Sequence, residues 1–255
     1  MSANQQVLAG TKGINSGQQV FTTSGTWVCP AGVTKVSVVS VGQGGIAGFG
    51  TPDGVIHGGS GGALAYANNI AVTPGNSYTI TIDATSSTFD SGGAASPSAG
   101  AGSSSTGAYG PAGGAVISGT GGPGGYGGTG SAGAYSSAGG GGAGGYSGAG
   151  GTGAFAPTPN PGYDASGGGG SGGGAGGSYG GGGGVGLLGA GSSGTAVPYP
   201  GGQGKGGSGG GDSTSTDAGA YGGGSNYLKN PGSGAVRIIW PGDVRQFPST
   251  RTADE

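Results

Sequence analysis

Hydrophobic and polar residues alternate in short stretches near both ends of the chain and lose this alternation in the middle. The clearest stretch covers residues 33–41, where Val36, Val38 and Val41 are set among polar neighbours. A period of two places alternate side chains on one face of a strand. We therefore expect a strand here with one buried face.

A second pair of stretches follows the same rule. Residues 61–72 are mostly apolar, and residues 77–83 alternate with Tyr78, Ile80 and Ile82 on one face. Between them, residues 73–76 read Thr-Pro-Gly-Asn, in which Pro fixes φ and Gly permits a positive φ. The pattern predicts a hairpin formed by the two stretches.

Shorter β-type segments complete this frame at residues 20–23, 25–30 and 233–241. The last of them is apolar enough for a central strand, and we expect it to pair with the first sheet and remove an exposed edge. Residues 84–106 are rich in Ser, Ala and Gly and are expected to form a loop. Residues 243–250 are expected to form an extended tail.

The middle of the chain, from about residue 107 to residue 224, repeats glycine at every third position. A period of three matches the extended polyproline-II helix and neither an α-helix nor a strand. Only glycine lets neighbouring backbones touch, and their lateral hydrogen bonds would satisfy groups that this helix leaves unpaired. The main runs are Gly121-Gly124-Gly127-Gly130-Gly133, Gly139-Gly142-Gly145-Gly148-Gly151 and Gly174-Gly177-Gly180-Gly183-Gly186-Gly189.

Composition removes two competing interpretations of this repeat. Glycine supplies 77 of 255 residues, about four times its usual share of about 7 %. Charged residues are only 6 %, whereas disordered chains are usually rich in charge. Collagen needs an unbroken register and Pro at about 15–20 %, and this chain has 14 Pro and frequent breaks.

The expected fold class is therefore all-β and irregular, with almost no α-helix. A small antiparallel β-sheet frame, built from N-terminal strands and the C-terminal strand, should enclose a bundle of polyglycine-II helices. We divide one compact domain into four parts: an attachment arm at 1–19, a β-strand frame at 20–85, the glycine-rich bundle at 86–232, and a closing strand and tail at 233–255.

Charge and reactive residues disfavour several functions. The net charge is −2 without a basic cluster, so we expect no nucleic-acid partner, and no apolar stretch approaches the ~20 residues of a membrane span. The first ten residues lack the pattern of a secretory signal. A single His57, a single Cys29 and isolated carboxylates predict no enzyme, no cofactor and no metal site.

Three motifs resemble the glycine-rich domain of bacteriophage tail and tail-fibre proteins. They are residues 25–45 (GTWVCPAGVTKVSVVSVGQGG), the segment 63–83 with its Thr-Pro-Gly turn, and residues 234–250 (GAVRIIWPGDVRQFPST). The middle of the chain resembles the same family by composition. It also looks like the receptor-binding tip of some long tail fibres, although the N-terminal half departs from that class.

This resemblance implies a virion protein of the tail or tail fibre, made in the host cytoplasm. We expect a host receptor-binding adhesin, and the alternative is a purely structural tail or capsid-decoration protein. Expected partners are other virion tail proteins and a host surface polysaccharide or outer-membrane protein. A homotrimer is the default assembly for a virion appendage, and a monomeric bundle fits the sequence equally well.

Aromatic and acidic residues in the breaks of the glycine period are the receptor-contact candidates, because a flat ring can stack and its hydroxyl can hydrogen-bond. For each tyrosine, packing against glycine backbones is the competing interpretation. The candidates are Tyr109, Tyr135, Phe155, Tyr163, Asp164, Tyr199, Asp212 and Tyr221.

Overall fold

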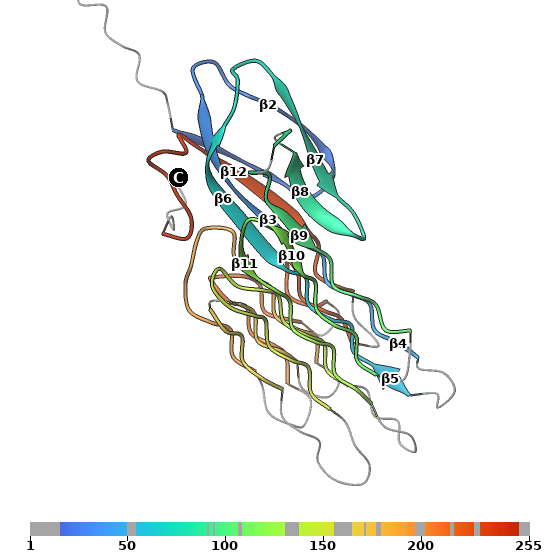
Figure 1. The fold of residues 1–255 in the computed structure, drawn as a ribbon. Coiled ribbons are helices and arrows are strands. Elements are labelled where there is room, and N and C mark those ends of the chain that lie inside the picture. The colour runs from blue at the N-terminus through green and yellow to red at the C-terminus, as the bar shows by residue number, and fades with distance from the viewer. Residues whose placement is uncertain are drawn as a thin grey trace, which may run out of the picture.

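Every regular element that the structure describes is a β-strand, which confirms the expected all-β class. The structure is a computed structural model. It describes residues 16–49, 55–90, 92–93, 95–106, 109–130, 138–155, 165–170, 172–176, 180–196, 202–214, 217–226 and 230–249. Two antiparallel five-stranded sheets form one end of the molecule, and extended segments run from them to the other end (Figure 1).

The strands fall into two sheets and one short ribbon. The first sheet has the order β1 (Gly17–Phe21), β12 (Ala235–Trp240), β3 (Lys35–Val41), β6 (Leu64–Ala71) and β11 (Thr120–Gly122). The second sheet has the order β10 (Val116–Ser118), β9 (Ser98–Gly100), β8 (Ser86–Asp90), β7 (Ser77–Ile82) and β2 (Gly25–Val28). The ribbon pairs β4 (Gly48–Phe49) with β5 (Ile56–His57).

The two sheets face each other across an apolar core. Trp27 of the second sheet is only 1 % exposed, and its ring lies 6.1 Å from that of Phe89 and 5.8 Å from that of Trp240. Val36 and Val38 of β3 close this core from the first sheet. Burial of these large side chains supplies the hydrophobic stabilisation that the glycine-rich middle cannot provide.

The opposite face of the first sheet is also covered. Val39 and Val41 of β3 pack against Tyr146 and Val185, which belong to the glycine-rich middle. The expectation of a single buried face was therefore wrong, and Val41 faces away from Val36 and Val38. The reason is that glycine segments, with almost no side chains, lie close enough to the sheet to exclude water from it.

The last strand closes the sheet as the sequence predicted. β12 lies between β1 and β3 and is antiparallel to both. Its residues are buried except for the half-buried Trp240, in keeping with a central position. β1 begins at Gly17, three residues before the segment at which we expected the frame to start.

The predicted hairpin between residues 61–72 and 77–83 does not form. β6 pairs with β3 and β11 in the first sheet, whereas β7 pairs with β2 and β8 in the second. The turn at 73–76 carries the chain from one sheet to the other, so that Ile70 and Ile80 enter the same core from opposite sides. A short turn with a positive φ at Gly75 serves this corner as well as it would serve a hairpin.

Two other expectations need correction. Residues 84–106 contain β8 and β9, because Asp83 accepts hydrogen bonds from the N–H groups of Thr85 and Ser86 and turns the chain back along β7. The C-terminal tail is not extended. It forms turns that bury Phe247, whose N–H and carbonyl groups bond the side-chain amide of Asn68.

Glycine segments of the middle are joined by backbone hydrogen bonds in a pattern with a period of three. The N–H groups of 140 and 143 donate to one segment, those of 141 and 144 to a second, and those of 142 and 145 to a third. A strand would alternate between two directions instead. The six acceptor carbonyls, in order from residue 140 to residue 145, are those of Gly180, Gly59, Gly151, Gly183, Gly62 and Gly148.

The close approach of these segments requires glycine. A Cβ added to Gly142 would lie 2.0 Å from the carbonyl oxygen of Gly173, and one added to Gly125 would lie 1.9 Å from that of Gly151. Both neighbours are backbone atoms that hydrogen bonds hold in place. The segments therefore form a closely packed array that no larger residue can enter at these positions.

Candidate functional site

The β4–β5 ribbon and several glycine segments reach the end of the molecule that is farthest from the two five-stranded sheets, with the ribbon at one edge (Figure 1). Hydrogen bonds hold them there: the N–H of Gly128 donates to Gly139 (2.8 Å), and that of Ala138 donates to Ile56 of the ribbon (3.2 Å). The N–H of Ala154 donates to Gly176 at 3.2 Å. Because these residues flank breaks in the glycine repeat, the array brings the described residues beside several breaks to one end, which we call the distal end.

Large apolar side chains are exposed on the segments that reach the distal end. Tyr109 is 80 % exposed, and Ile46, Phe49 and Tyr126 are each more than half exposed. Of these, the sequence singled out only Tyr109. Ile46 and Phe49 precede the glycine repeat, and Tyr126 lies inside a regular glycine run, so a search for breaks in the period could not find them.

The sequence-predicted contact residues do not share one location. Tyr109 and the half-buried Phe155 lie on segments that reach the distal end. Asp212 and Tyr221 lie elsewhere in the molecule, as described below. The other candidates fall outside the described residues: Tyr135, Tyr163, Asp164 and Tyr199.

Asp212 stabilises a turn on the surface. Its carboxylate accepts a hydrogen bond from Nζ of Lys205 (2.9 Å) and another from the N–H of Gly206 (2.8 Å). Both bonds lower the pKa of Asp212 below its ordinary value, and the bond from Lys205 has the larger effect. Both charged side chains are about half exposed, so the ion pair contributes little to stability.

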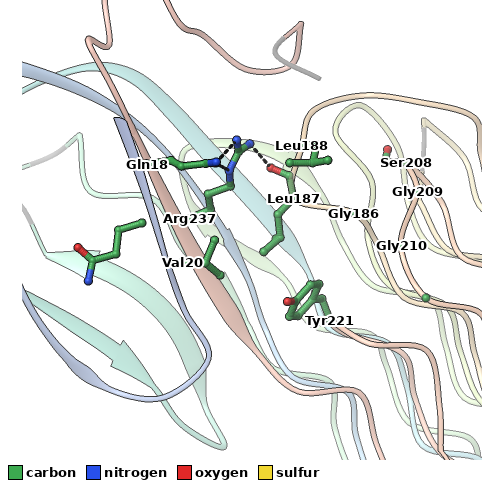
Figure 2. Close-up of a pocket in the computed structure, with 12 residues that line it drawn as sticks. Gln18, Val20, Gly186, Leu187, Leu188, Ser208, Gly209, Gly210, Tyr221 and Arg237 are labelled. Atoms are coloured by element: carbon green, nitrogen blue, oxygen red, sulfur yellow. Dashed lines mark hydrogen bonds between the residues drawn. The ribbon is translucent and has the colours of Figure 1, made fainter. Parts of the chain in front are cut away.

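Tyr221 lines a cavity at the other end of the array, beside the sheets (Figure 2). The cavity measures about 540 Å³ and lies between β1 and the turns at 186–188 and 208–211. Val20 and Leu188, which are 45 % and 38 % exposed, belong to its apolar lining. The sequence places Tyr221 in a loop but gives no sign of this cavity, because the walls of the cavity come from distant parts of the chain.

Arg237 of β12 lies in the wall of the cavity and is 1 % exposed. Its Nε and Nη2 atoms both donate to Oε1 of Gln18, at 2.9 Å and 2.6 Å, and its Nη1 donates to the carbonyl oxygen of Leu187 at 2.9 Å (Figure 2). A buried cation is costly unless hydrogen bonds surround it. The guanidinium thus ties β12, the edge strand β1 and the glycine turn together.

Backbone strain is concentrated at the same cavity. Ser208 and Tyr221 both line it, and both have a positive φ, 52° and 60°. For residues other than glycine, such conformations cost about 1–3 kcal/mol each and often mark binding sites. Asn69 is the remaining residue of this kind within the described ranges.

A buried tyrosine supports the turn that forms one wall. The hydroxyl of Tyr146 donates to the carbonyl of Gly186 and accepts from the N–H of Gly189, both at 3.1 Å. Burial raises the pKa of Tyr146 well above its ordinary value. The hydroxyl therefore stays protonated and keeps both bonds at neutral pH.

Among the residues that the structure describes, no reactive cluster accompanies either location. Within the described ranges there is no group of three or more His, Cys, Asp or Glu residues placed to bind a metal ion, and no helix suited to crossing a membrane. Cys29 is buried, and burial raises the pKa of its thiol. The buried His57 accepts a hydrogen bond at Nδ1 from the N–H of Gly130, which ties the ribbon to the array.

No protein-family model matches this chain, and a search of curated proteins finds no match.

Proposed function

We propose that this chain is a bacteriophage tail or tail-fibre protein that binds the host surface through the distal end. One observation carries the proposal: in a closely packed array joined by backbone hydrogen bonds, described residues that flank several breaks in the glycine repeat meet at the end opposite the sheets, and the segments that reach this end carry exposed aromatic side chains. Binding residues are commonly carried on loops positioned by a rigid scaffold.

The array is a bundle of polyglycine-II helices. Support comes from the threefold repeat of donors at residues 140–145, since a helix with three residues per turn directs successive N–H groups toward three neighbours. Apart from Gly121 in β11, the described glycines with positive φ in this region lie at turns or bends, such as Gly170, Gly189, Gly209 and Gly222. The runs between them are consistent with the negative φ of a left-handed helix.

Such an array suits a receptor-binding role. Its surface has few charges to make nonspecific contacts, and recognition is left to the residues at its end. Tyr109 and Phe49 offer flat rings for stacking on a sugar or on an apolar protein surface. The partners are a host polysaccharide or outer-membrane protein at the distal end and other virion tail proteins at the sheet end, with a homotrimer as the expected assembly.

The test is binding of the purified full chain, fluorescently labelled, to host cells and to isolated envelope fractions. We expect saturable binding that the double variant F49A/Y109A reduces at least about tenfold, the loss expected when aromatic anchors worth roughly 1.4 kcal/mol are removed. The matched control is Val28→Ala, a change at an exposed apolar residue of β2 on the sheet end.

The alternative, a purely structural virion protein, predicts a different result. A chain that assembles onto the particle but binds neither cells nor any envelope fraction would be structural only. Equal cell binding by the double variant and the wild-type chain would show that the residues contacting the host do not lie at the distal end.

A further inference from the structure

The cavity beside β1 presents positive charge to whatever enters it. Arg237 is the one charged residue among the described residues that line it, and none of them is acidic. In a partly buried wall, where water screens poorly, one unit of positive charge favours an anionic ligand over a neutral one. This argues for a carboxylate or phosphate on the ligand.

Gln18 occupies the position that a ligand carboxylate would take. Its Oε1 accepts from both Nε and Nη2 of Arg237, along the edge of the guanidinium that carboxylates prefer. Gln18 is an exposed residue of an edge strand, so its side chain can rotate away without unfolding the sheet. A carboxylate placed there would add an opposite charge, and its two oxygens could each accept one of two parallel bonds from the guanidinium, whereas the amide offers a single oxygen.

The remainder of the cavity suits a hydroxylated ring. Tyr221 and Leu188 contribute apolar surface. Gly209 and Gly211 also line the cavity, and within the described ranges their N–H groups make no hydrogen bond. These donors can bind ring hydroxyl groups, while the side chains contact the apolar face of the ring.

The size of the cavity agrees with a ligand site. The volume of about 540 Å³ falls within the range of about 300–1,000 Å³ typical of small-ligand pockets. Ser208, which lines the cavity, and Gly209 both have positive φ, as the two central residues of a type I′ turn do, and the N–H of Gly210 closes this turn on the carbonyl of Gly207 at 2.8 Å.

We propose that this cavity binds an acidic sugar residue of the hexuronic acid type, whose carboxylate replaces the Gln18 amide on Arg237. The site is separate from the distal end. It rests on the proposed function only for the source of the sugar, a polysaccharide on the bacterial surface.

Two opposite changes at one position test the proposal. Gln18→Glu places a carboxylate of the chain itself on Arg237 and should weaken uronate binding at least about tenfold, whereas Gln18→Ala removes the competing amide and should strengthen it. Binding of D-glucuronate, D-galacturonate, D-glucose and oligogalacturonate to the full chain is measured by NMR titration and calorimetry. Tryptophan fluorescence confirms that each variant is folded, because Trp27 lies in the core.

The expected result is that the wild-type chain binds both uronates and the oligomer but binds glucose little or not at all. The affinity for uronate should fall from Gln18→Ala to wild type to Gln18→Glu. Equal binding of glucose and glucuronate, or no effect of Gln18→Glu, would overturn the proposal. Tighter binding of the peptide acetyl-Thr-Glu-Thr-amide than of any uronate would assign the cavity to a protein partner instead.

The same variants separate this proposal from the distal one. A Gln18→Glu chain that loses uronate binding but still binds cells supports both sites acting independently. If the Gln18→Glu chain loses cell binding while the wild-type chain binds no uronate, the acidic-sugar site is contradicted. The contact at the distal end is then tested separately by the double variant F49A/Y109A.

Discussion

Replacing Gly142 by Ala tests whether the glycine array is packed as closely as the structure indicates. The added Cβ would lie 2.0 Å from the carbonyl oxygen of Gly173, whereas ordinary contact begins at 3.4 Å. Relief therefore requires a displacement of about 1.4 Å, the difference between those two distances.

That displacement breaks bonds of the segment that contains Gly173. Its carbonyl accepts from Gly151 at 3.0 Å and its N–H donates to Ala143 at 2.9 Å, and both distances would exceed the 3.5 Å limit of a hydrogen bond. Leaving a buried backbone group unsatisfied costs about 1–3 kcal/mol, so two lost bonds cost roughly 2–6 kcal/mol. Domains are typically stable by only about 5–15 kcal/mol, so this loss is large.

Gly167→Ala is the matched control. Its Cβ would meet no atom closer than 3.4 Å, and its φ is not in the left-handed region. Because Ala restricts the unfolded chain, we expect this variant to be unchanged or more stable by about 0.4–1 kcal/mol. Urea unfolding followed by tryptophan fluorescence measures both variants, and a difference between them below about 0.5 kcal/mol would refute close packing of the array.

Two further predictions concern single polar groups. Tyr146→Phe keeps the buried ring but removes a hydroxyl that makes two backbone hydrogen bonds, so the free energy of unfolding should fall by about 1–3 kcal/mol. An unchanged urea midpoint would show that the hydroxyl does not support the turn. The carboxylate of Asp83 accepts hydrogen bonds that lower its pKa below the ordinary 3.8. In order of effect, the donors are the side-chain hydroxyl of Thr85, the N–H of Thr85 and the N–H of Ser86. Because the folded-state pKa is the lower one, the stabilisation is present above the unfolded pKa and is lost as pH falls through the folded pKa. The stability difference between wild type and Asp83→Ala should therefore shrink on acidification, and a difference that does not vary with pH would contradict this.

Local patterns along the chain identified most of the frame. The alternation at 33–41 and 77–83 and the apolar run at 233–241 correspond to β3, β7 and β12, and β12 pairs as expected. These predictions succeeded because strand formation depends on period and side-chain type, which are written in a few consecutive residues. The two faces of β3 were not predictable, since what covers the second face comes from residues more than 100 positions away.

The candidate site shows the same limit. Breaks in the glycine period drew attention to Tyr109, whose side chain is 80 % exposed, and whether it contacts a receptor stays a prediction. They did not distinguish the distal end from the cavity, so Tyr109 and Tyr221 were grouped although they lie at opposite ends of the array. The sequence shows Arg237 only as part of a strand, because its partners Gln18 and Leu187 are brought to it by the fold.

The sequence by itself determined that the chain is all-β, that its ends form strands, and that its middle can be closely packed, because these properties follow from residue type and spacing. Tertiary structure alone decided which sheet each strand joins, which breaks lie together, and where a buried cation meets an exposed amide. The physical reason is that a four-residue turn or a glycine run permits several paths, and only packing against the rest of the molecule selects one of them.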